Sequence, residues 1–211
     1  MTYPVSVTVE PSIENRNRLT TFFRFFLAIP HIILVGGAGI GFAGGTSRND
    51  STTWSFGEGG LLGAVAGFLA IVSWFTIVFA GIHIVGIRQF CAFYLRWQTR
   101  ARAYLTLLQD PYPPFGDGPY PTSFDIIDPQ GPRDRLTVAF RLILAIPHFL
   151  ILVFLFIAWF LTTILAWFAI LFTGAYPRGM YEFSVGVMRW ILRVEAYMML
   201  LVDDYPPFSL T

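Results

Sequence analysis

The chain has 211 residues, of which 55% are apolar and 13% are charged, whereas about 25% of the residues in a typical soluble domain are charged. A formal net charge of +1 excludes the strongly basic surface with which proteins bind nucleic acid, so nucleic acid is not an expected partner. The only cysteine, Cys91, excludes an internal disulfide framework.

The N-terminal segment, residues 2–18, is polar and carries no signal-peptide cleavage site. Two regions that follow are too apolar for a soluble core in a chain of this length. The first consists of residues 22–43 and 61–87, and the second, residues 142–176, contains no acidic residue, lysine or arginine. Since a helix of about 20 apolar residues crosses a bilayer, we expect an all-α, multi-pass integral membrane protein.

The sequence contains one unit twice. Residues 16–31 read RNRLTTFFRFFLAIPH and correspond to residues 133–148, which read RDRLTVAFRLILAIPH. Residues 96–115 correspond in the same way to residues 189–208. Each unit combines a short alternating segment, an arginine-flanked apolar region, an amphipathic helix and a proline pair that cannot continue a helix.

Arginines lie on both sides of each apolar region, and positively charged flanks prefer the cytoplasm. Both flanks of a unit can be cytoplasmic only if the unit crosses the membrane an even number of times. We therefore predict a transmembrane hairpin in each unit, residues 1–118 and 119–211, which gives roughly four spans and cytoplasmic termini. The first hairpin turns through extra chain with a polar loop at about residues 44–60, and the second turns near residues 159–163.

Two amphipathic helices follow the apolar regions, at residues 88–109 and around residues 183–201. Each carries aromatic and aliphatic residues on one face and arginines on the other; these arginines are Arg96, Arg100, Arg189 and Arg193. The pattern is typical of a helix in the membrane interface, so the four arginines are candidate contacts for anionic lipid headgroups. The alternative is that the apolar face packs against the spans as structure.

The stretch LAIPH occurs in both units. Arg24 and His31 are seven residues apart, as are Arg141 and His148, so each pair lies on one helix face. Polar groups inside a span are expensive and are candidates for function. Either the arginine reaches the headgroups and the histidine bonds a neighbour, or the two pairs form a shared site for a haem, a quinone, a metal or a lipid phosphate. Two histidines without nearby carboxylates or cysteines are a weak metal signal, and no cofactor is predicted.

The second unit resembles the bacterial membrane family known as domain of unknown function 4389. The resemblance is carried by LFTGAYPRGMYEF at residues 171–183, RWILRVEAY at residues 189–197 and DDYPPF at residues 203–208. The first unit looks like a diverged copy, because residues 78–90 read VFAGIHIVGIRQF and lack the tyrosine, proline and arginine of that stretch. The resemblance implies a multi-pass protein of the bacterial inner membrane and supplies neither an activity nor catalytic residues.

The sequence contains no G-x-S-x-G elbow, Walker loop, H-E-x-x-H or paired-cysteine motif, so an enzyme is not expected. We expect a non-enzymatic accessory or scaffold subunit that contacts anionic lipid and a membrane complex, with a membrane-protein partner or as a homo-oligomer. The alternative is a binder of a cofactor or small lipid through the arginine–histidine pairs. A channel or transporter ranks last, because every acidic residue lies outside the predicted spans.

Overall fold

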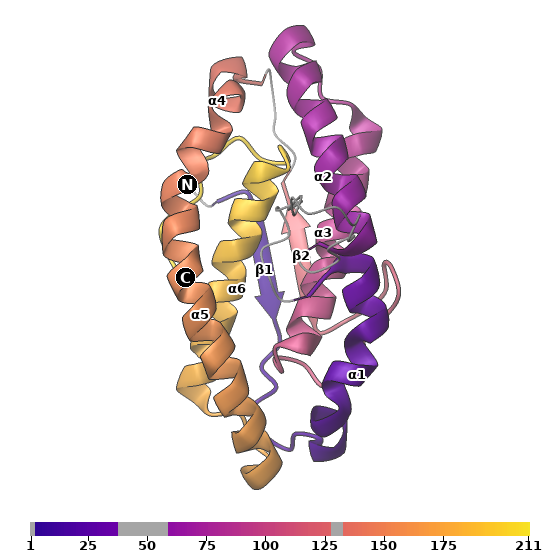
Figure 1. The fold of residues 1–211 in the computed structure, drawn as a ribbon, viewed down its shortest axis with the longest axis vertical. Coiled ribbons are helices and arrows are strands. Elements are labelled where there is room, and N and C mark those ends of the chain that lie inside the picture. The colour runs from indigo at the N-terminus through magenta and orange to yellow at the C-terminus, as the bar shows by residue number, and fades with distance from the viewer. Residues whose placement is uncertain (1–2, 38–58, 128–132) are drawn as a thin grey trace, which may run out of the picture.

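The computed structural model describes residues 3–37, 59–127 and 133–211 (Figure 1). Three of its helical segments are long and apolar enough to cross a membrane, which confirms the prediction of a mostly helical protein with membrane-type helices. The prediction of an all-α fold misses a small sheet. In chain order the elements are β1 (Val5–Val9), α1 (Arg18–Val35), α2 (Gly60–Phe75), η1 (Thr76–Ala80), α3 (Val85–Leu105), β2 (Thr122–Ile126), α4 (Arg135–Ala139), α5 (Arg141–Thr173) and α6 (Arg178–Met198).

The helix of each apolar region begins at an equivalent capped position. The side chain of Asn17 accepts hydrogen bonds from two backbone N–H groups of α1, and Asp134 does the same for α4. Such a side chain satisfies donors that the first turn of a helix leaves open. In the second unit, α4 ends at Ala139, and after Phe140 the helix α5 continues for 33 residues, which is about 50 Å.

The helices α1 and α2 continue one another along one side of the molecule, and α5 forms the other side (Figure 1). Contacts along α3 establish this order. Cys91 of α3 lies against Ala66 of α2, and Trp97, further along α3, bonds His31 of α1. Earlier contacts in both helices involve later residues of α3, since Tyr94 bonds Gly59 and Arg24 bonds Tyr104, so α1 and α2 both run antiparallel to α3. In a hairpin they would run in opposite directions, so the predicted first hairpin is wrong.

The junction between α1 and α2 depends on glycine. Gly60 has φ +62°, and a Cβ atom there would lie 2.5 Å from the backbone nitrogen of Gly36. In the sequence repeat, Val35 is equivalent to Leu152 and Gly60 is equivalent to Val153. Leu152 and Val153 are neighbours in α5. The helix of the first unit is therefore the helix of the second unit with residues 36–59 inserted. The predicted polar loop at residues 44–60 lies almost wholly outside the described residues.

The predicted second hairpin is also wrong, because α5 passes through residues 159–163 without a turn. The hydroxyls of Thr162 and Thr163 each donate to a carbonyl one turn earlier in the same helix. The segment contains no proline or glycine that would end a helix. The described residues therefore provide three candidate spans in place of roughly four, since the apolar region of the second unit is one continuous helix.

We call α1, α2 and η1 together the long helix of the first unit, and α4 with α5 the long helix of the second unit. The two long helices run in opposite directions. Trp74 Nε1 donates to the carbonyl of Val138 (2.9 Å), and at the equivalent position Trp167 Nε1 donates to the carbonyl of Thr21 (3.0 Å). The start of each long helix thus lies beside the end of the other. This arrangement puts arginines at both ends of the pair without any hairpin.

The two strands form the layer opposite to the long helices. β1 pairs antiparallel with β2, with Val5 opposite Ile126 and Val9 opposite Thr122. Val5, Val7, Val9 and Phe124 are buried on the inner face. The inner face packs on α3 and α6, so that β1 lies against α6 of the other unit and β2 against α3 of the other unit. The units are therefore interlocked.

The helices α3 and α6 form the middle layer and meet at one ion pair. Arg102 and Glu195 occupy equivalent positions of the two units, and both side chains are buried. The pair is bidentate, with Arg102 nitrogens 3.0 Å and 2.8 Å from the two carboxylate oxygens. The two units thus meet through opposite charges at the same place in each.

We expect single charge reversals at this pair to be far more damaging than the double reversal. Arg102→Glu or Glu195→Arg buries two like charges, and breaking a buried pair costs about 3–5 kcal/mol. The double variant Arg102→Glu/Glu195→Arg restores opposite charges at equivalent positions. Thermal unfolding in detergent checks this: a double variant as unstable as the single ones would contradict the exchangeable geometry.

Candidate functional site

His31 lies in an aromatic cluster that ties α1 to α3. Its ring is buried, and its Nδ1 accepts a hydrogen bond from Trp97 Nε1 at 3.0 Å. Phe115 stacks on the ring at a centroid distance of 4.5 Å, and Tyr112 packs at 5.1 Å. A nitrogen that accepts a hydrogen bond carries no proton, so the histidine is held as the tautomer protonated on Nε2.

His148 lies in the equivalent cluster of the second unit. Its Nδ1 accepts a hydrogen bond from Trp190 Nε1 at 3.1 Å, and Phe208 stacks on it at 4.1 Å. Tyr205 completes the cluster at 4.8 Å. Among the described residues the two clusters have no member in common, so the structure does not bring the two histidines together as a shared site requires.

Arg24 and Arg141 bind residues at and after the ends of α3 and α6 through ion pairs and charge-assisted hydrogen bonds. Arg24 donates to the carbonyls of Tyr104 (3.2 Å) and Gln109 (2.8 Å), and pairs with Asp110 at 2.6 Å. Arg141 donates to the carbonyl of Tyr197 at 2.8 Å and pairs with Asp203. Charge-assisted bonds of this kind are about twice as strong as neutral ones.

The partners of these residues form one motif. We call residues 110–115 and 203–208, both of the form D-x-Y-P-P-F, the straps. In each strap the aspartate binds the arginine, and the tyrosine and phenylalanine enclose the histidine. From the sequence, the proline pairs of the straps predict helix stops. The repetition of the straps together with R-x-x-x-x-x-x-H was the available signal that the two motifs meet.

A second arginine reaches each strap. Arg16 pairs with Asp110 at 2.8 Å, and Arg133 pairs with Asp203 at 3.0 Å. Burial lowers the pKa of Arg16, and the neighbouring Asp110 carboxylate opposes this shift. Each strap carboxylate therefore joins two arginines from the start of the long helix to the end of the amphipathic helix.

The four arginines predicted to face lipid contact their own chain. Arg96 and Arg100 pair with Asp117 at 3.3 and 3.4 Å. Arg189 donates to the carbonyl of Val7 at 3.1 Å, and Arg193 to the carbonyl of Ser209 at 3.3 Å. Since α3 and α6 pack against the long helices, their apolar faces have the structural role that the sequence left open.

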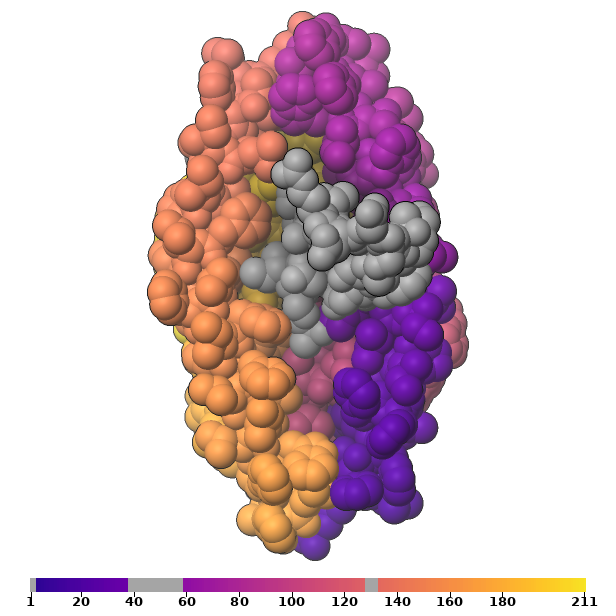
Figure 2. All heavy atoms as spheres, in the orientation of Figure 1, coloured from indigo at the N-terminus to yellow at the C-terminus, as the bar shows by residue number. Residues whose placement is uncertain are grey.

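Figure 2 shows the side of the molecule on which α1, α2 and α5 lie. The exposed residues of these long helices are apolar along nearly their whole length. From Leu142 to Phe172 every exposed residue of α5 is apolar, and the same holds from Leu19 to Ile33 and from Leu61 to Ala80. We call this surface the apolar face. Its large members are Leu19, Phe22, Phe23, Phe25, Phe26, Leu27, Ile29, Ile33, Leu61, Val65, Phe68, Ile71, Phe75, Phe79, Leu142, Ile143, Leu144, Ile146, Leu150, Ile151, Val153, Phe154, Ile157, Phe160, Leu161, Ile164, Leu165, Phe168 and Phe172.

The outer side of the strand pair is its chemical opposite. We call it the polar face; its exposed strand residues are Ser6, Thr8, Ser123 and Asp125. Alternation along a strand places these side chains away from the buried valines. The molecule thus has one apolar and one polar outer layer, with α3 and α6 between them.

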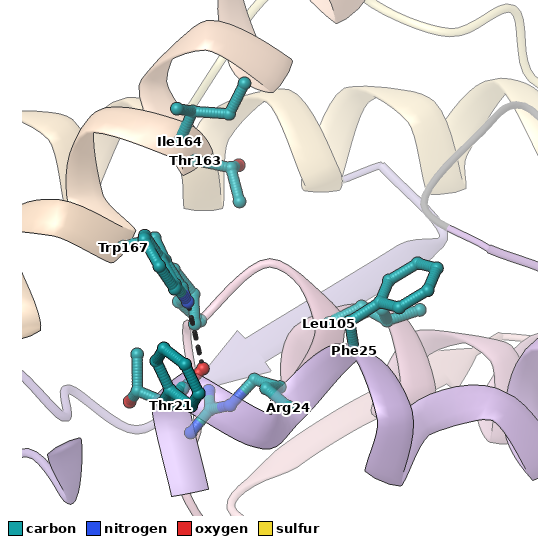
Figure 3. A pocket seen from close by; sticks show the side chains of 9 residues that line it. Thr21, Arg24, Phe25, Leu105, Thr163, Ile164 and Trp167 are labelled. Carbon is teal, nitrogen blue, oxygen red and sulfur yellow. Dashed lines mark hydrogen bonds between the residues drawn. The ribbon is translucent and has the colours of Figure 1, made fainter. Parts of the chain in front are cut away.

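A groove of about 270 Å³ opens between the start of α1 and the later half of α5 (Figure 3). Of the predicted site residues only Arg24 lines it. The buried hydroxyl of Thr21 has no hydrogen-bond partner among the described residues. In the other half of the molecule Val138 and Ala70 stand in place of Thr21 and Thr163. The full lining is Thr21, Phe22, Arg24, Phe25, Leu105, Leu107, Thr163, Ile164 and Trp167.

Within the described ranges no group of three His, Cys, Asp or Glu side chains lies close enough to hold a metal ion. The family model described as "Domain of unknown function (DUF4389)" matches residues 59–116 and 135–209, which is more than half of the chain. Each match contains one amphipathic helix and its strap, and the first begins where the inserted segment ends. No curated protein and no solved structure matches the chain.

We expect removal of a strap aromatic to loosen the fold. Phe208→Ala loses the stacking on His148 and its buried contacts, which together amount to about 1–3 kcal/mol. The control is Phe172→Ala, since Phe172 is 77% exposed. Thermal unfolding in detergent compares them: equal midpoints would show that the straps do not hold the long helices.

Proposed function

Because the chain belongs to the family described as Domain of unknown function (DUF4389), a description without an activity, we propose a function from its geometry. The protein is a non-enzymatic accessory or scaffold protein embedded in the bacterial cytoplasmic membrane. It buries the apolar face in lipid and keeps both termini in the cytoplasm. The observation that carries this proposal is the apolar face, which runs along all of α1, α2, η1 and α5.

An exposed apolar surface of this extent is unfavourable in contact with water. Soluble monomers rarely expose contiguous apolar patches larger than a few hundred Å². Burial of one leucine or phenylalanine side chain yields about 1.5–3 kcal/mol, so the many members of the apolar face make release into water very unfavourable. Lipid acyl chains offer an apolar cover along the full length of the helices.

The arginine–histidine pairs support a structural role and not a catalytic one. Each arginine has a strap carboxylate and backbone carbonyls as partners, and each histidine has a tryptophan donor and a stacked phenylalanine. These contacts engage the terminal nitrogens of both guanidinium groups and Nδ1 of both imidazoles. Anionic lipid is the proposed partner of Arg18, Arg135 and Arg178, which are exposed near the ends of the long helices.

We expect charges on the apolar face to weaken membrane insertion. An arginine near the centre of a bilayer costs about 2.5–3.5 kcal/mol, so the triple variant Phe68→Arg/Phe154→Arg/Phe160→Arg should leave vesicles in alkaline carbonate. The matched control places the same charges on the polar face, as Ser6→Arg/Thr8→Arg/Ser123→Arg, and should stay bound. Vesicle flotation measures both; equal retention would reject the apolar face as the lipid contact.

A second candidate function is the binding of one small lipid in the groove beside Arg24. The groove opens among exposed apolar residues of α1 and α5, and the unpartnered Thr21 hydroxyl is specific to this half of the molecule. Ile164→Trp would fill it, whereas Ile71→Trp alters the equivalent position in the other half. We expect native mass spectrometry in mild detergent to show loss of a bound lipid only for Ile164→Trp; identical spectra would remove this candidate.

A further inference from the structure

We infer that the two long helices lie parallel to the membrane surface, immersed in one leaflet, and do not cross the bilayer. The inference rests on the proposed function, because it specifies how the apolar face meets lipid. The partner of the apolar face is then the acyl region of a single leaflet, and the partner of the polar face is water.

The length of α5 does not suit an upright helix. The 33 residues of α5 extend over about 50 Å, whereas the hydrocarbon core is about 30 Å thick. To fit its apolar length inside that core, α5 would have to tilt by more than about 50°, and spanning helices tilt by up to about 40°. The helix instead matches a position along the membrane.

The position of the strand pair also does not suit upright helices. β1 and β2 lie alongside the middle of the long helices and not near their ends (Figure 1). If α5 stood upright, the polar face, including the exposed Asp125, would lie at the depth of the bilayer core. Open sheet edges exposed to lipid do not occur there, because their backbone groups would have no hydrogen-bond partners.

The polar side chains of the long helices all point to one side. Arg24, His31, Arg141 and His148 are all buried and all point toward the layer of α3 and α6. With the helices in the membrane plane this direction is toward the headgroups. The carboxylates of Asp110 and Asp203 keep 22% and 28% of their side-chain surface exposed, so they would stay hydrated.

The straps fit the same orientation. Their aromatic side chains are partly exposed between the long helices and the middle layer; they are Tyr112, Phe115, Tyr205 and Phe208. That boundary coincides with the headgroup region when the long helices are immersed in a leaflet. Aromatic residues concentrate at this level of a membrane. Apolar face, straps and polar face then follow the polarity gradient from acyl chains to water.

The test measures the depth of α5 at three positions. Ile143, Phe154 and Phe172 point to the same side at 100° per residue and are all exposed. Each is replaced by cysteine in the full chain carrying Cys91→Ala, labelled with a nitroxide and reconstituted into phosphatidylethanolamine–phosphatidylglycerol vesicles. Collisions of the nitroxide with oxygen and with a water-soluble nickel chelate report its depth. A label at Ser123→Cys serves as the matched reference on the polar face.

We expect the three labels on α5 to lie at the same depth to within about 5 Å, with the Ser123 label open to the nickel chelate. An upright α5 would separate the labels at Phe154 and Phe172 by about 27 Å along the membrane normal. That result, or a Ser123 label reached by oxygen alone, would overturn the inference while leaving membrane binding intact. Failure of all four variants to float with vesicles, when circular dichroism shows them folded, would instead reject the proposed function and the inference with it.

Discussion

The buried pair of Arg102 and Glu195 is the interaction on which the arrangement of the two units depends. A buried ion pair is stable only with good geometry, and this one is bidentate. Because the two residues occupy equivalent positions, two copies of one unit would bring like charges together. The opposite charges therefore select the pairing of the first unit with the second. The exchange of strands between units, β1 onto α6 and β2 onto α3, joins the same two units.

A second constraint explains why apolar helices contain arginine and histidine. Polar groups in such helices are costly unless they are paired, and here each strap supplies a carboxylate to the arginine and aromatic rings that pack around the histidine. The polar residues lie on one stripe of each long helix, so the rest of the circumference stays apolar. This polar stripe binds each long helix to the middle layer. The apolar face is therefore the side of the helix that points away from the middle layer.

The layers together form a slab with opposite outer surfaces, and this shape relates the repeat to the membrane. The long helices run antiparallel and each unit supplies one, so both halves of the slab present the same chemistry. The inserted residues 36–59 interrupt the helix of the first unit without changing its axis, since α1 and α2 both lie along α3. The groove at Thr21 is a local difference between halves that are otherwise equivalent.

The sequence alone determined the repeat, the membrane character of the helices and the family, and it singled out Arg24, His31, Arg141 and His148 as polar residues on one helix face. These follow from local pattern, because periodicity shows which side of a helix is buried. It does not show what covers that side. The hydrogen bond from Arg24 to Asp110 joins residues 86 positions apart in the sequence. The one from Arg102 to Glu195 joins residues 93 positions apart. Arginine flanks predict an even number of crossings, whereas the packed structure has antiparallel helices that place arginines at both ends. The tertiary structure therefore decided topology and the role of the straps, since both depend on contacts between distant segments.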